Sequence, residues 1–418
     1  MEIQLNSKIL SLIHKGVEIR CPYSVDIGEE VDIERISNHN VIIYPGTRLY
    51  GPETYIGEGA IIGHEGPATI HNCQIGPHVK LSSGTFTQAI FLSHAVVGPG
   101  AHIREGTIFE EYASAAHTVG LKQTILFPYV TLGSLINFCD CLMSGGTGAK
   151  NHSEVGSSYI HFNFTPNQDK ATPSLFGDVP QGVMLNQQPI FLGGQGGIVG
   201  PCCITFNTVI AAGSLYRKDE FKPGRLLFGK DLSGGSVPLE PQIYKTVKRI
   251  VINNITYISN LIALMRWYDL VRRQFIGGDY FSEELFMGLK SKLTMAIDER
   301  IKRFSEFCEK MPCSVQLLQE ILKESEPSLL IQQKTMLFER KTELVNTLNH
   351  LRTLDTHERD RDCFIAFIQK GINRYGKDYL AVIKGLSNNE TQIGTTWLQT
   401  IVDTVMMRIF DIIPLCKP

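Results

Sequence analysis

Hydrophobic residues recur at every sixth position through the first half of the chain. The clearest run is Leu192, Ile198, Ile204, Ile210 and Tyr216. A period of six belongs neither to a helix nor to a strand, whose side chains repeat about every 3.6 and 2 residues. It fits a three-sided coil with one inward side chain per side, so that three hexads make one turn of a left-handed parallel β-helix. We therefore predict a mainly β solenoid in which each coil buries its apolar residues by stacking on the next.

The same spacing extends back toward the N-terminus. Residues six apart are Ile27 and Ile33, Ile43 and Leu49, Ile56 and Ile62, Ile75 and Leu81, then Val97, Ile103 and Phe109, and Leu132 and Phe138. At roughly eighteen residues per turn, positions 25–220 give about nine to eleven coils. The stretches 82–87 and 110–118 interrupt the spacing, and we expect them to be extruded loops. Loops on a rigid scaffold often contain the functional residues.

The pattern changes to helical spacing near residue 231. The stretch 231–241 is rich in glycine, serine and proline, which is typical of a linker. After it, apolar residues recur every four positions, as on one face of a helix: Leu285, Leu289, Leu293, Ile297 and Ile301. We expect a long helix over 244–276 and others over 314–324, 328–353, 358–372, 376–384 and 392–413. The predicted organisation is a helical segment (1–20), a β-helix domain (21–230), a linker (231–241) and an all-α domain (242–418) whose partner is unknown.

Composition and charge argue against several classes of function. The net charge of −2 gives no basic face for a nucleic acid. Residues 1–19 lack the apolar core of a signal peptide, and no apolar run is long enough to span a membrane. The ten cysteines are scattered, and no histidine pair has the spacing of a metal site, so we expect free thiols and no metal. These features favour a cytoplasmic protein.

Residues 155–219 resemble a known enzyme family. Val155-Gly156 opens a hexad, Asn163-Phe164 and Lys170 follow in a polar loop, and Ile210-Ala211-Ala212-Gly213 leads to Arg217-Lys218-Asp219. The hexads are similar to those of hexapeptide-repeat acyltransferases. This stretch resembles the acetyltransferase domain of the bifunctional enzyme that makes UDP-N-acetylglucosamine. The resemblance implies a left-handed β-helix, acetyl-CoA as co-substrate and active sites between the subunits of a homotrimer.

The chain also departs from that family. Phe164 stands where the family has a tyrosine, and Pro128 falls near the place of the catalytic histidine. The family's N-terminal uridylyltransferase domain has no counterpart here. Acyl transfer to an amine needs a base and a donor for the oxyanion, and histidine suits the first role near neutral pH. We therefore consider His152 and His117 as alternative bases. His161, at an inward hexad position, is a further candidate or a structural residue.

The remaining candidate residues follow from the resemblance and from side-chain chemistry. Asn163 would bind the acceptor or the thioester carbonyl. Lys150, Asn151 and Lys170 would bind the substrate. Ala211, Ala212 and Gly213 would let the pantetheine arm approach the backbone, and Arg217 and Lys218 would meet the phosphates of coenzyme A.

Two functions from different classes remain open. The first is an acyl-CoA-dependent N-acyltransferase that acts on an amino-sugar phosphate or a nucleotide sugar. This function is favoured by the presence of Asn163, Lys170 and the stretch Ala211-Ala212-Gly213. The second is a non-catalytic protein that binds a nucleotide sugar or builds an assembly on the β-helix. Phe164 and the missing histidine favour that alternative.

Overall fold

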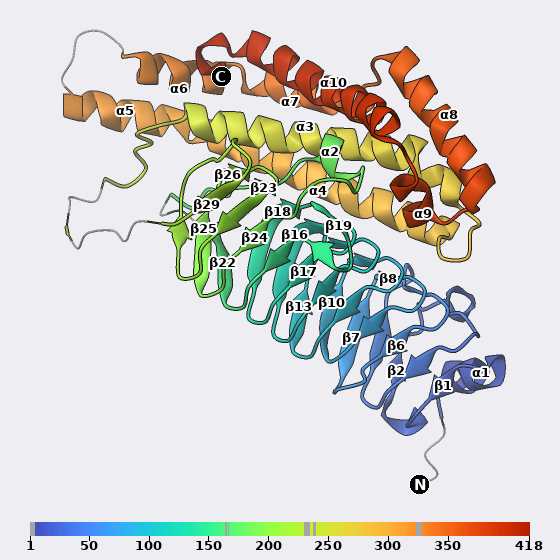
Figure 1. The fold of residues 1–418 in the computed structure, drawn as a ribbon. Coiled ribbons are helices and arrows are strands. Elements are labelled where there is room, and N and C mark those ends of the chain that lie inside the picture. Colours follow the sequence, from blue (N-terminus) through green and yellow to red (C-terminus); the bar gives the residue numbers. More distant parts are fainter. Residues whose placement is uncertain (1–4, 164, 166, 230–234, 237–239, 323–327) are drawn as a thin grey trace.

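The first half of the chain is a parallel β-solenoid of about eleven turns, over residues 26–227 (Figure 1). The computed structural model describes residues 5–163, 165, 167–229, 235–236, 240–322 and 328–418. The predicted β-helix followed by a helical region is confirmed. Helix α1 (Ser7–Lys15) precedes the solenoid and ends at Gly16, which has a positive φ of 111° as expected for a C-terminal cap.

Each turn of the solenoid has three sides. The first side is an eleven-stranded sheet: β1 (Glu18–Ile19), β3 (Ile42–Ile43), β6 (Ile61–Ile62), β9 (Lys80–Leu81), β12 (Val96–Val97), β15 (Ser114–Ala115), β17 (Thr131–Leu132), β21 (Glu154–Val155), β24 (Phe191–Leu192), β27 (Thr208–Ile210) and β29 (Arg225–Leu227). The second side contains β2 (Asp26–Ile27), β4 (Arg48–Tyr50), β7 (Ala68–His71), β10 (Gly84–Thr87), β13 (Ala101–Ile103), β22 (Tyr159–Phe162), β25 (Gly196–Val199) and β28 (Leu215–Tyr216). The third side contains β5 (Tyr55–Ile56), β8 (Gln74–Ile75), β11 (Ile90–Phe91), β14 (Ile108–Phe109), β23 (Ser174–Phe176) and β26 (Cys202–Ile204).

Two longer strands turn the corner between the second and third sides. Strand β16 (Gly120–Leu126) pairs with β13 through its first residues and with β14 through its last. Strand β18 (Asn137–Met143) follows the same path. Gln123 and Asp140 stand at the bends with φ values of 50° and 61°. Asp140 is thereby placed at a corner, where the solenoid meets the helical region.

Helices cover the third side of the solenoid (Figure 1). The helical region consists of α3 (Lys248–Leu270), α4 (Glu283–Glu309), α5 (Met311–Leu322), α6 (Leu329–Glu339), α7 (Lys341–Leu351), α8 (Glu358–Tyr375), α9 (Tyr379–Lys384) and α10 (Asn388–Ile412), with short 3₁₀ turns at Arg272–Phe275 and Pro414–Cys416. Two further 3₁₀ turns, Pro22–Ser24 and Ile33–Arg35, lie in the first coils of the solenoid. Helix α4 packs on β8, β11 and β14, and α3 packs on β23. A Cβ atom on Gly288 would lie 3.0 Å from Ile90 Cδ1 and 2.9 Å from Gln74 Cγ, so glycine permits this close approach.

Most outward side chains of the third side are apolar, as the inward ones are, with Gln74 as a polar exception. Its strands carry consecutive apolar pairs: Ile90-Phe91, Ile108-Phe109, Ile125-Leu126, Leu142-Met143 and Leu175-Phe176. One member of each pair fills the solenoid and the other packs beneath the helices. Burial on both faces makes the two halves of the chain share one hydrophobic core.

Several expectations about the elements need correction. Residues 82–87 and 110–118 are not extruded loops, because they contain strands β10 and β15. The helix expected over 328–353 is two helices, α6 and α7, separated at Arg340. The long helix expected over 244–276 is shorter, because α3 ends at Leu270 and a 3₁₀ turn follows.

The actual excursions from the coils lie later in the chain. One is a hairpin of β19 (Gly146–Gly148) and β20 (Asn151–His152), and another is the loop 163–173 between β22 and β23. A third excursion holds the short helix α2 (Val179–Gly182). Most of the predicted linker 231–241 lies outside the described residues, so the proposed domain boundaries stay predictions. Among the described helices, none has the length and apolar character needed to cross a membrane.

Candidate functional site

The loop over 163–173 leads from the second side of the solenoid to the third and contains Asn163 and Lys170. Most of its contacts to other segments come from the helical region. They are hydrogen bonds from Arg300 to the Lys170 carbonyl (3.0 Å), from Lys310 to the Asn167 carbonyl (2.8 Å), from Asn254 to the Ala171 carbonyl (2.9 Å) and from the Tyr244 hydroxyl to Asp169 (2.8 Å). Within the loop, the Thr172 hydroxyl donates to the Asn163 carbonyl over 3.0 Å. The helical region therefore fixes the segment that contains two of the predicted site residues.

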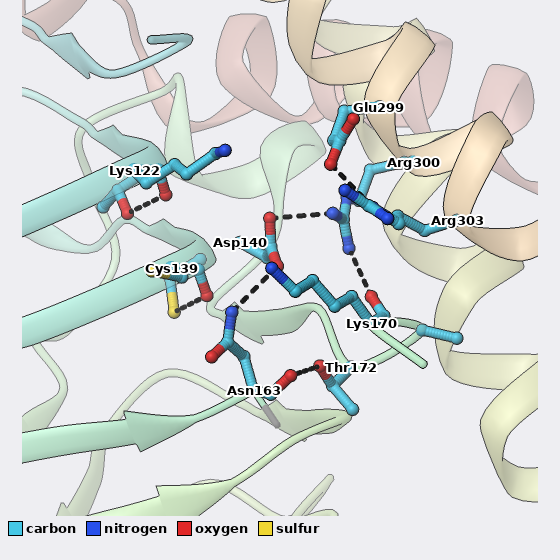
Figure 2. Close-up of polar contacts among 12 residues, drawn as sticks. Lys122, Cys139, Asp140, Asn163, Lys170, Thr172, Glu299, Arg300 and Arg303 are labelled. Carbon is cyan, nitrogen blue, oxygen red and sulfur yellow. Dashed lines mark hydrogen bonds and ion pairs between the residues drawn. The ribbon is translucent and has the colours of Figure 1, made fainter. Parts of the chain in front are cut away.

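A buried ion pair lies beside this loop. The Arg300 Nη2 atom of α4 lies 2.8 Å from Asp140 Oδ1, and the two side chains are only 2% and 5% exposed. The Asn163 amide donates to the other carboxylate oxygen of Asp140 over 3.4 Å. Figure 2 shows Asp140 between Arg300 and Asn163. The helical region thus orients the Asn163 amide through one carboxylate of the solenoid.

These residues border a pocket with an empty volume of ≈ 630 Å³. Its lining consists of Arg104, Lys122, Asn137, Cys139, Asp140, Asn163, Lys170 and Glu299. The Lys122 ammonium forms an ion pair with Glu105 over 2.5 Å. Lys170 forms no ion pair with any described residue. The lining has three cations and two amides beside the carboxylates of Asp140 and Glu299, so cations outnumber anions. This favours a phosphate, because charged donors form strong hydrogen bonds to its oxygens.

The only thiol that borders the pocket among the described residues is that of Cys139. Burial raises its pKa, and the neighbouring Asp140 carboxylate raises it further. The thiol is therefore protonated at neutral pH, and a protonated thiol is a poor nucleophile. Cys139 thus offers no route to covalent catalysis here. All ten cysteines of the chain are free.

The two candidate bases lie at other corners of the same solenoid. His117 precedes the second side and contacts Thr118 Oγ1 (3.3 Å), whereas Lys122 stands at the far end of that side. His152 lies on the β19–β20 hairpin before the first side, one whole side away from Asp140. The hairpin also holds Lys150 and Asn151, whose amide donates to Thr147. Within one chain, neither histidine comes together with Asn163, and their catalytic roles stay predictions.

His161 lies inside the solenoid. It is 3% exposed, and its Nε2 atom lies 2.8 Å from the Ser174 hydroxyl. Burial lowers the pKa of His161 to about 4, so the ring is neutral near pH 7. Its position makes it a core residue that an acceptor amine cannot reach. Among the described residues, no group of three or more His, Cys, Asp or Glu side chains is placed to hold a metal.

The residues predicted for coenzyme A lie together at the last coils. Ala211, Ala212 and Gly213 form the corner between β27 and β28, and a Cβ atom on Gly213 would have no neighbour within 4 Å. Arg217 and Lys218 border an open pocket of ≈ 1010 Å³ empty volume at the last coil. The corner of His117 is four strand spacings away in the first sheet, roughly 19 Å. These positions form a surface of their own, separate from the Asn163 pocket.

Sequence reasoning missed several pocket residues. Arg104, Lys122 and Cys139 each follow an inward residue that is in register with the next coil. A polar residue that recurs at the same position of successive coils is a signal that is visible in the sequence. Arg300 has no such signal, because it comes from a helix 160 residues after Asp140 in the chain. Phe164, which marked a departure from the family, lies outside the described residues.

Comparisons with known proteins agree with the resemblance seen in the sequence. The chain resembles bifunctional protein GlmU. The GlmU of Thermotoga maritima is 27% identical over 213 residues, which are 51% of this chain and 42% of that protein. The GlmU of Carboxydothermus hydrogenoformans gives the same identity and coverage, and that of Pelobacter propionicus is 26% identical over 209 residues. The chain thus spans less than half the length of these relatives. No protein-family model matches it.

These similarities confirm the resemblance that the hexads predicted. The aligned residues make up about half of this chain, and the other half lies outside the alignment.

Proposed function

We propose that this protein is an acyl-CoA-dependent N-acyltransferase that acetylates an amino-sugar phosphate or a nucleotide sugar. One observation is the main support for this proposal. Asn163 and Lys170, which match the family's polar loop, lie in one pocket with Arg104 and Lys122. The cations would bind a substrate phosphate, and the Asn163 amide would hold the acceptor or the thioester carbonyl. The similarity to bifunctional protein GlmU supports the same chemistry.

Acetyl-CoA is the expected acyl donor. Its pantetheine arm would follow the corner of Ala211, Ala212 and Gly213, where small residues leave the backbone accessible. Its phosphates would meet Arg217 and Lys218, which border the open pocket at the last coil. Because the acceptor amine must lose a proton, a base is also required.

The base must come from another subunit if it is one of the predicted histidines. His152 and His117 lie at other corners of the solenoid than the Asn163 pocket of their own chain. In a homotrimer, such a corner can meet the Asn163 loop of a neighbour. Acyl transfer would therefore depend on assembly, as expected for sites between subunits. The free thiols fit a reducing compartment such as the cytoplasm.

The second candidate is a non-catalytic protein that binds the same sugar ligand. The separation of both histidines from the pocket within one chain favours it. Both functions use the Asn163 pocket for the phosphate, so binding alone does not distinguish them.

Thioester cleavage distinguishes them. The full chain is mixed with acetyl-CoA and glucosamine 1-phosphate or UDP-glucosamine, and released thiol is followed. We expect thiol release that His152→Ala or His117→Ala lowers by roughly a hundredfold or more. Loss of activity in only one of these variants identifies the base. Binding of the sugar without any thiol release would support the non-catalytic function.

A further inference from the structure

Four aromatic rings stack along the corner between the third and first sides. His78, His94, Tyr112 and Tyr129 each stand two residues before a strand of the first side, in successive coils. Neighbouring ring centroids are 4.9, 4.6 and 5.4 Å apart, with interplanar angles of 19° or less. All four residues have positive φ values, which suit the corner but do not require an aromatic side chain. The column therefore presents the edges of its rings as a continuous wall.

The opposite wall comes from the helical region. Lys384, at the end of α9, donates to the Tyr129 hydroxyl over 2.7 Å and lies 4.2 Å from the centroid of that ring. The Tyr280 ring meets His94 edge to face, with centroids 5.6 Å apart. Between the two walls is a cleft with an empty volume of ≈ 800 Å³ including its mouth, which we call the corner cleft. Concave sites between two structural units are common ligand sites.

A buried carboxylate borders the corner cleft. Glu111 forms an ion pair with Arg272, and their side chains are 8% and 1% exposed. The second oxygen of Glu111, Oε2, has no hydrogen-bond partner among the described residues. Leaving a buried acceptor unsatisfied costs free energy, so an N–H or O–H group from a ligand would stabilise this arrangement.

The corner cleft also presents both signs of charge. Lys377 and Lys384 supply ammonium groups, and Glu111 and Asp378 supply carboxylates. The phenols of Tyr112 and Tyr280 lie among them as neutral donors and acceptors.

We propose that the corner cleft binds a small polar ligand in which an anionic group is joined to hydroxyl or amine donors. The anionic group pairs with Lys384, and a donor reaches the carboxylate of Glu111. Sugar phosphates and amino acids share this chemistry. The corner cleft has no lining residue in common with the Asn163 pocket, so the inference does not depend on the proposed function.

The test uses the full chain with Lys170→Met, which removes one cation of the Asn163 pocket and so weakens binding there, while substitutions in the corner cleft report on the second site. Isothermal titration with glucose 1-phosphate and, separately, with serine distinguishes the two sources of ligand. We expect saturable binding of at least one probe. Adding Lys384→Met should weaken it about tenfold, as for loss of a charged hydrogen bond. Tyr280→Ala, at a residue 46% exposed, should also weaken binding.

Two results would overturn the inference. One is the absence of saturable binding of either probe up to about 10 mM, which is the range of very weak ligands. The other is binding by the Lys384→Met and Tyr280→Ala variants that is as strong as binding by the Lys170→Met parent. Thermal unfolding of each variant shows whether it is folded. If the Lys384→Met variant does not fold, binding by the Tyr280→Ala variant decides the test.

Discussion

Arg300 joins the two halves of the chain through a single buried carboxylate. It pairs with Asp140 of the solenoid and also donates to the Lys170 carbonyl. A buried charge without its partner is far more costly than the pair itself is stabilising. The residue thus affects both stability and the geometry of the pocket.

Replacing Arg300 with leucine should lower the free energy of unfolding by about 3–5 kcal/mol, because Asp140 would remain buried and unpaired. Urea denaturation measures this loss. Arg303→Leu is the matched control on the same helix, since its ion pairs with Glu299 and Glu306 are partly exposed and should contribute about 1 kcal/mol or less. Equal losses in the two variants would contradict the role given to Arg300.

Glu110 should make stability depend on pH. Burial raises the pKa of this carboxyl to about 7, against the attraction of Arg272, and the Tyr268 hydroxyl donates to it over 2.6 Å. Between its ordinary pKa of 4.5 and about 7, the folded state holds a proton that the unfolded state has lost. The contribution is therefore present at low pH, decreases as pH rises through this window and levels off above it.

The matching experiment compares wild type with Glu110→Gln, which stays neutral. Denaturation at about pH 5 and pH 8 should show the wild type losing roughly 1–3 kcal/mol more than the variant. The same pH dependence in both proteins would mean that Glu110 is ionised throughout.

At the residue scale, the sequence points to positions where a local motif exists, and the roles of these residues stay predictions. Asn163 and Lys170 were singled out from their polar loop, and they do line one pocket. The sequence does not point to Asp140, because its role depends on the ion pair with Arg300. No local pattern links two residues that are so far apart in the chain. His161 occupies the inward hexad position that the spacing predicted.

At the scale of elements, the hexad period reports only the inward position, so it predicts the coils without predicting which side the helices cover. Several strands of the third side carry two buried apolar residues in succession, as in Ile90-Phe91. The first side also has apolar pairs, such as Ile42-Ile43 and Ile61-Ile62, but their outward members are only partly buried. Burial of both faces therefore marks the covered side in the structure, whereas apolar pairs in the sequence do not.

Close packing of α4 on the third side should make Gly288 intolerant of a large side chain. Gly288→Leu would force α4 away from Ile90 and Gln74, and we expect a loss of about 1–3 kcal/mol in the free energy of unfolding. Met287→Leu, at the adjacent position that is 56% exposed, should change it by less than about 0.5 kcal/mol. Thermal or urea unfolding of both variants provides the comparison. A Gly288→Leu protein as stable as wild type would show that the helix does not pack this tightly.

At the scale of the whole molecule, the helical layer leaves the first side free for assembly. Phe191, Val209 and Leu226 stand side by side on its last three strands, and their exposed fractions are 38%, 40% and 62%. An apolar stripe of this kind favours contact with another subunit. The family resemblance of residues 155–219 leads us to propose three chains.

Light scattering should therefore give the mass of a homotrimer, three times 46.7 kDa. Val209→Lys, in the middle of the stripe, should shift the mass toward that of one chain, because a charge would be buried in the contact. Thr85→Lys, exposed on the second side, serves as the control. A wild-type mass of one chain at micromolar concentration would exclude the trimer and, with it, a base supplied by a neighbour.

The claim central to both candidate functions is that the Asn163 pocket binds a sugar phosphate, and binding of glucosamine 1-phosphate tests it most directly. Isothermal titration compares wild type, Lys170→Met and the control Lys80→Met, whose lysine is exposed on the first side. Our account predicts that Lys170→Met weakens the tightest binding about tenfold or more, as expected for the loss of one charged hydrogen bond to phosphate. Lys80→Met should bind like wild type. Identical binding by all three proteins would contradict the assignment of this pocket to the sugar phosphate.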